Sequence, residues 1–237
     1  MSNHEHRPAS QTGRRGRRCL GAVASALLVV TLSSPAFAGV GIFGEYGRNI
    51  ATSGGERGLA LTLTGLSTEF FDRNDITVGV AFDSNLARDR LFNSRTDIGF
   101  HAALYGDPTS SAVMGTGLGG SLAWTLGLGL VRSEQMRLWL GPNLRLNADW
   151  YDASLFNTVG DHADLQLGFG PQIGLNLHTG DSATVTISGV YNYKWGWNFL
   201  PDLSAGGTIP IGTISHRDHY LGINVAFFWR GGGDKFE

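Results

Sequence analysis

The feature that most constrains this chain is a long, unbroken alternation of apolar and other residues between positions 136 and 150. Even positions carry Met, Leu, Leu, Pro, Leu, Leu, Ala and Trp, whereas odd positions carry Arg, Trp, Gly, Asn, Arg, Asn and Asp. A period of two places alternate residues on opposite faces of a β-strand. The alternation lasts for about fifteen residues, far more than the 5–6 residues of an ordinary globular strand.

Similar alternation recurs along the rest of the chain. It is clear in residues 165–177, 183–197 and 220–229, and weaker in residues 40–47, 59–66, 76–82, 98–105 and 122–131. These segments are odd in number, whereas bacterial single-chain barrels have an even number of strands. Either segment 40–47 lies outside the wall, which gives eight strands, or a weak strand within residues 112–118 gives ten. We favour eight. Pro142 and Pro171 lie inside two of the patterns, where we expect bulges or breaks in pairing.

The first 38 residues have the order of a secretory signal peptide. Arginines at positions 14, 15, 17 and 18 precede an apolar run at residues 20–32, and Ala36-Phe37-Ala38 forms a small-x-small cleavage site before Gly39. The apolar run is shorter than the about 20 residues that a membrane helix needs. We therefore expect residues 1–38 to be a cleaved signal and residues 39–237 to form a single domain.

Charge and cysteine content exclude several functions. The chain has 18 Lys and Arg against 20 Asp and Glu, for a net charge of −2, and no basic run follows the signal. This balance argues against a nucleic-acid-binding protein. The single cysteine, Cys19, falls within the expected signal, so the exported domain has no disulfide and no thiolate metal site. We expect no cofactor and no metal.

Two kinds of all-β fold fit such strands. In a secreted periplasmic β-sandwich with a binding role, the apolar face would be the core and the other face would meet water. In a transmembrane barrel, the apolar face meets lipid and the mixed face lines the interior. The mixed face here carries Gly, Asn, Gln, Arg and Thr, not the Lys and Glu of a solvated surface. We therefore expect a closed antiparallel transmembrane β-barrel of eight strands, with ten strands as the alternative.

The aromatic residues support the barrel. They gather towards the ends of the apolar faces, where membrane barrels have interfacial girdles. The expected interface aromatics are Trp150, Tyr151, Tyr193, Trp195, Trp197, Phe227 and Trp229.

With its Ala36-Phe37-Ala38 signal, its girdle aromatics and its final alternating segment YLGINVAFFW (residues 220–229), the chain resembles the small outer-membrane β-barrel proteins of Gram-negative bacteria. The resemblance implies location in the cell outer membrane. It also implies contact with outer-membrane lipid, and with the assembly machinery that reads the last strand during biogenesis.

The polar residues of the mixed face are the expected lumen lining. They comprise Arg137, Asn143, Arg145, Asn147, Asp149, Gln166, Gln172, Asn176, His178, Asn192 and Lys194. In an eight-stranded barrel such side chains pair with one another and fill the lumen. In a wider barrel they would line a small aqueous path.

The only candidate catalytic residues are Ser215, His216 and His219, near the start of the last strand. They have the chemistry of acyl transfer, but neighbouring strand residues point in opposite directions. We favour a structural or surface-interaction role, with a surface partner that the sequence does not identify. We therefore favour a protein that is not an enzyme. The alternatives are a narrow, porin-like diffusion channel for small solutes and a lipid A acyl hydrolase or acyltransferase.

Overall fold

A computed structural model describes residues 39–57, 72–84, 86, 91–106, 113–152, 161–179, 182–199 and 213–230. The described residues form eight strands. These are β1 (Gly39–Arg57), β2 (Asp72–Asp83), β3 (Phe92–Gly106), β4 (Val113–Arg132), β5 (Met136–Asp152), β6 (Asp161–His178), β7 (Ala183–Phe199) and β8 (Thr213–Arg230). Among the described residues no helix has the length and apolar character needed to cross a membrane.

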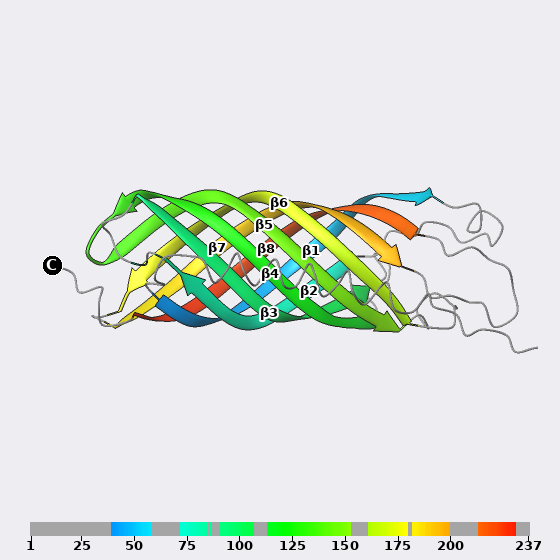
Figure 1. Ribbon diagram of the computed structural model, residues 1–237, viewed down its shortest axis with the longest axis horizontal. Helices are drawn as coiled ribbons and strands as arrows, with labels where there is room; N and C mark the ends of the chain where they lie inside the picture. Colours follow the sequence, from blue (N-terminus) through cyan, green and yellow to red (C-terminus); the bar gives the residue numbers. More distant parts are fainter. Residues whose placement is uncertain are drawn as a thin grey trace, which may run out of the picture. The chain divides into compact units, whose positions relative to one another are not determined.

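The strands close into one barrel. Each strand pairs antiparallel with the next along the chain, and β1 pairs antiparallel with β8, so the ring has no free edge (Figure 1). The expected closed antiparallel barrel with eight strands is therefore confirmed.

The reason given for eight strands was wrong in one respect. Residues 40–47 do not lie outside the wall, because they belong to β1 and pair with both β2 and β8. The weak segment at residues 112–118 is the beginning of β4, which starts at Val113. The candidate strand at residues 59–66 lies outside the described residues.

The two ends of the barrel differ in their connections. At one end, called here the terminal end, β1 starts at Gly39, β8 finishes at Arg230, and the links between strands are residues 84–91, 133–135 and 179–182. At the other, called the loop end, the links are residues 58–71, 107–112, 153–160 and 200–212. Figure 1 shows the terminal end on the left and the loop end on the right.

The register gives the stagger of the strands. A path through directly paired residues leaves β1 at Ile42 and returns to β1 at Ser53 after passing Val80, Ile98, Leu122, Leu146, Leu167, Trp195 and Arg217. The return point lies about ten residues nearer the loop end once the bulge at residues 51–53 is allowed for, and such stagger tilts the strands against the axis. Eight tilted strands leave an interior just wide enough for side chains to fill.

The two prolines interrupt pairing as expected. Pro142 and Pro171 lie directly opposite each other in β5 and β6, within a continuous register. The β4–β5 ladder skips the residues around Pro142, and the β6–β7 ladder skips those around Pro171. Because proline has no N–H to donate, each one breaks the ladder with its other neighbouring strand while the register continues on both sides.

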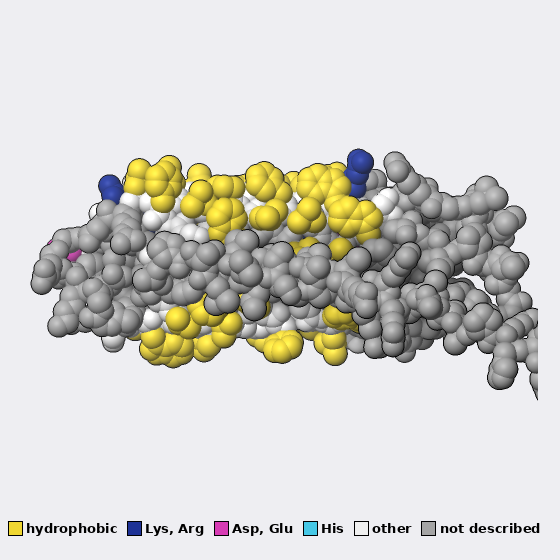
Figure 2. All heavy atoms as spheres, viewed as in Figure 1, with side chains coloured by type: hydrophobic (Ala, Val, Ile, Leu, Met, Phe, Trp, Pro, Cys, Tyr) yellow, Lys and Arg dark blue, Asp and Glu magenta, His cyan; other side chains and the backbone are white. Residues whose placement is uncertain are grey.

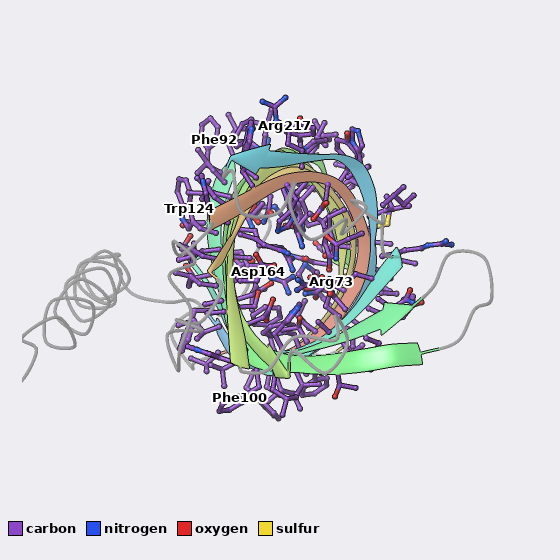
Figure 3. All side chains as sticks on the ribbon, turned by 90° about the vertical axis from the view of Figure 1, so that its right-hand side faces the viewer. Arg73, Phe92, Phe100, Trp124, Asp164 and Arg217 are labelled. Atoms are coloured by element: carbon purple, nitrogen blue, oxygen red, sulfur yellow. The ribbon has the colours of Figure 1, made fainter. Side chains whose placement is uncertain are left out.

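The barrel has its polar residues inside and its apolar residues outside. Large apolar side chains from all eight strands are exposed, including Ile42, Val78, Phe100, Leu144 and Val225. On the face seen in Figure 2, hydrophobic side chains (yellow) gather along the barrel between its two ends. Figure 3 looks in from the loop end and shows Arg73 and Asp164 in the lumen, with Phe92, Phe100 and Trp124 pointing outward.

Interior glycines make room for large side chains in the lumen. An added methyl group should therefore destabilise the barrel at an interior glycine but not at an outward-facing glycine of the same strand. A Cβ at Gly47 would overlap the ring of Tyr220, whereas a Cβ at outward-facing Gly44 would meet nothing within 4 Å. We expect Gly47→Ala to destabilise the barrel by about 1–3 kcal/mol through overpacking. Gly44→Ala, the control, is expected to be neutral or slightly stabilising. Urea unfolding in lipid vesicles measures both, and equal stability of the two variants would contradict the prediction.

Candidate functional site

The polar residues expected to line the lumen lie on β5, β6 and β7. Arg137, Asn143, Arg145, Asn147 and Asp149 line it from β5, and residues of β6 and β7 line it further round the ring. All of the expected residues are buried except His178, which is half-buried. The buried members on β6 and β7 are Gln166, Gln172, Asn176, Asn192 and Lys194.

Arg73 is the hub of the network in the half of the lumen near the loop end. Its Nε donates to Asp75 Oδ1 at 2.6 Å, and its Nη2 donates to Asp149 Oδ2 at 2.5 Å. Its Nη1 donates to Asp164 Oδ2 at 3.2 Å. Nη2 also lies 2.7 Å from Nε2 of His101. One guanidinium thus joins carboxylates from β2, β5 and β6, and Figure 3 shows Arg73 and Asp164 facing each other inside the barrel.

Two further groups bind these carboxylates. Lys194 Nζ lies 3.4 Å from Asp75 Oδ2, and its side chain is fully buried. The His216 ring bridges two carboxylates, with Nε2 3.0 Å from Asp164 Oδ1 and Nδ1 3.0 Å from Asp218 Oδ2. Buried charges of opposite sign therefore compensate one another across the lumen, as a low-dielectric interior requires.

A second cluster fills the lumen closer to the terminal end. Both Nη atoms of Arg145 donate to the carboxylate of Glu45, and the hydroxyl of Tyr220 donates to that same carboxylate. Asn224 Nδ2 donates to Glu45 Oε2 at 3.1 Å, and Arg95 Nη2 donates to Asn224 Oδ1 at 2.9 Å. Arg145 is on β5 and Glu45 on β1, so this bidentate pair spans the ring from one wall to the opposite one.

A cluster of apolar side chains, called here the plug, lies in the lumen near the terminal end. Leu86 comes from the link between β2 and β3, yet its side chain is completely buried. It clusters with Phe43, Ala81, Ala226 and Phe228. The sequence-based lining did not include the plug, because alternation within strands says nothing about Leu86, which lies outside the strands.

Several central residues of the network were also missed. Glu45, Arg73, Asp75, Arg95 and His101 belong to β1, β2 and β3, where we had recognised only short, weak alternation. Their odd numbers match the inward faces of those strands. Extending the period of two along β1, β2 and β3 would have assigned these five residues to the lumen. Alternation could not predict which residues they bind across the ring, because those pairings depend on the stagger of the strands.

The candidate catalytic residues do not come together. His216 points into the lumen between Asp164 and Asp218, whereas Ser215 and His219 lie on the outward face of β8. Four residues of strand separate Ser215 from His219, which is about 13 Å. His219 instead contacts Tyr191, whose hydroxyl oxygen lies 2.5 Å from Nδ1. Within the described residues, no group of three or more His, Cys, Asp or Glu could hold a metal ion.

The expected interface aromatics lie near the two ends of the barrel. Trp150, Trp195 and Trp197 are exposed towards the loop end, and Trp229 is exposed at the terminal end. Tyr193 packs edge-on against Trp195, with 4.9 Å between ring centroids, and Phe227 packs edge-on against Trp229 at 5.0 Å. Tyr151 belongs to β5, but its side chain lies outside the described residues.

An arginine placed among the exposed apolar side chains of the barrel tests whether lipid surrounds them. Val78 lies outward in the middle of β2, whereas Val40 lies outward near the terminal end, where it pairs with Trp229. We expect Val78→Arg to lower the free energy of unfolding by about 2–4 kcal/mol and Val40→Arg to cost at most about 1 kcal/mol, because the cost depends on membrane depth. Unfolding by urea in vesicles measures the difference. Equal costs would mean that no hydrocarbon layer surrounds β2.

A closed barrel with an apolar exterior and a polar, filled interior defines the class of transmembrane β-barrel proteins. No protein-family model matches this sequence, and no curated protein sequence matches it.

The solved structures similar to this one are barrels of low sequence identity. Neisserial surface protein A (NspA) is 13% identical with a TM-score of 0.35, covering 78% of this chain and 96% of that one. The outer membrane protein OprG from Pseudomonas aeruginosa is 9% identical with a TM-score of 0.45, covering 80% and 96%. Ail, the attachment invasion locus protein of Yersinia pestis, is 9% identical with a TM-score of 0.32, covering 80% and 99%. At these values the likeness concerns the fold alone.

Proposed function

We propose that this protein is a barrel of the bacterial outer membrane, exported by a cleaved signal peptide. Two features support the location. The N-terminal 38 residues have the order of a secretory signal, and β1 starts at Gly39, directly after the expected cleavage site. Apolar side chains are exposed on all eight strands, and the strands pair in a closed ring without a free edge, as a lipid environment demands.

Within that membrane, the role is structural or interactive and not that of a conducting channel. The observation that carries this proposal is the bridging of the lumen by buried ion pairs. Arg73 joins β2 to β5 and β6, and Arg145 joins β5 to β1, with at most 4% of any of these side chains exposed. The plug adds apolar side chains to the polar groups buried near the terminal end, and apolar surface is costly for a hydrated ion to pass.

The links at the loop end supply the surface for interaction. Residues 58–71 and 200–212 are longer than any link at the terminal end. In membrane barrels short turns face the periplasm and long loops face outward. The barrel accordingly acts as a rigid support that holds these two links at the cell surface, where the partner remains to be identified.

Two separate measurements test the proposal: electrophoretic mobility in SDS before and after boiling, and conductance of the folded barrel. The protein in isolated outer membranes should migrate faster in unheated SDS than after boiling, because a closed barrel resists SDS. In planar bilayers the purified barrel should show no discrete conductance steps. An unshifted protein in the periplasmic fraction would overturn the membrane assignment. A stable conductance that changes in Arg145→Ala would favour the narrow channel instead.

A further inference from the structure

One outward face of the barrel combines basic and aromatic side chains. Arg217 and His219 lie on the outward face of β8, and Arg48 lies on the outward face of β1. Figure 3 shows Arg217 pointing away from the lumen. Among the described side chains, the outward-facing Arg, Lys and His residues of the loop-end half lie only on these two strands.

The register shows that these groups are neighbours. Ile50 of β1 pairs directly with His219, and Arg48 pairs with Leu221, so Arg48 is diagonal to His219. Diagonal neighbours in an antiparallel ladder are about 7–8 Å apart, within reach of long side chains. Arg217 is two residues from His219 on the same face of β8. The three groups therefore occupy one patch.

Aromatic side chains border this patch on β7. Trp195 pairs directly with Arg217, and Tyr193 pairs directly with His219. The Tyr193 and His219 rings meet edge-on with 5.4 Å between centroids, and the Tyr191 hydroxyl holds Nδ1 of His219. Tyr and Trp prefer the boundary where one end of the ring is apolar and the other wet.

We propose that this patch (Arg48, Arg217, His219, Tyr193 and Trp195) binds a phosphorylated glycolipid of the membrane leaflet at the loop end. Arginine recognises phosphate through charge-assisted hydrogen bonds, and histidine adds a further donor. The apolar face of a sugar ring stacks on exposed Trp and Tyr rings, which a simple phospholipid headgroup does not exploit. The acyl chains continue over the apolar faces of β7, β8 and β1, where Leu221, Ile223 and Val225 are exposed. This assignment rests on the proposed outer-membrane location.

Lipid binding to the purified, folded barrel tests the assignment. Lipid A, its phosphate-free form and phosphatidylglycerol are titrated in detergent, and the midpoint of thermal unfolding is followed. Wild-type protein should show a saturable rise in midpoint with lipid A and weaker responses to the other two lipids. The Arg48→Gln/Arg217→Gln/His219→Gln variant should bind lipid A about 30-fold more weakly, since each of the two lost arginines contributes about 1 kcal/mol near an anionic lipid. Trp195→Leu should weaken lipid A binding but leave phosphatidylglycerol binding unchanged.

The control is Arg132→Gln, an exposed arginine at the terminal end, which should bind lipid A like the wild type. Undiminished lipid A binding by the triple variant would overturn the assignment. So would equal binding of phosphatidylglycerol by the wild type, because any phosphate would then suffice. Each variant is first tested for its SDS heat shift in outer membranes. Absence of that shift in the wild type would refute the membrane location itself. Normal shifts without lipid A binding would refute only the lipid-binding proposal.

Discussion

Replacing Arg73 by Met is expected to have the largest effect of any single substitution in this barrel. The substitution keeps an unbranched side chain but leaves the carboxylates of Asp75, Asp149 and Asp164 without their shared cation. Removing one partner of a buried ion pair typically costs about 3–5 kcal/mol, and here three carboxylates lose a partner at once. We expect Arg73→Met to fail to fold into vesicles at neutral pH, as measured by the absence of an unheated, fast-migrating band in SDS.

The same variant should recover at acid pH. Asp75 and Asp164 keep Lys194 and His216 nearby but lose the Arg73 cation, so the buried negative charge is only partly balanced. Protonation removes that charge, so the cost of burying it falls as pH decreases. The wild type should show the opposite trend, because its carboxylates are paired in the folded state. Arg132→Met, at an exposed position of β4, is the control and should fold like the wild type at all pH values. Normal folding of Arg73→Met at neutral pH would show that the hub does not hold the barrel together.

The Arg145–Glu45 pair provides the second large effect. Arg145→Met should destabilise the barrel by about 3–5 kcal/mol, because Glu45 is then left as a buried charge bound only by Tyr220 and Asn224. Adding Glu45→Gln should restore much of the loss, because both charges are then removed while a polar group still faces Tyr220 and Asn224. Urea unfolding of the wild type, the two single variants and the double variant gives the coupling energy.

Conductance of the same double variant separates two views of the network. If the pair only stabilises the wall, the double variant stays closed, because the Arg73 hub and the Leu86 plug still fill the lumen. If the pair alone blocks ion flow, the double variant conducts. We expect the closed outcome, and discrete current steps in a planar bilayer would contradict it.

The fate of the residues in β8 shows what strand periodicity can and cannot predict. The alternation separates Ser215 and His219 from His216, and the structure places the first two outside and the third inside. It could not predict that His216 bridges Asp164 and Asp218, since Asp164 comes from β6, across β7. Likewise nothing local to β5 indicates that Arg145 would meet Glu45, which is 100 residues away in the chain.

In the strongly alternating segments, the sequence by itself determined the element type, the division of each strand into two faces and the composition of the apolar face. It did so because all three depend on a period of two that is local to each strand. Only the tertiary structure decided that β1 completes the ring, which carboxylate each lumen cation binds, and that Leu86 folds inward. These outcomes depend on the number and stagger of the strands, which bring together residues that share no local signal.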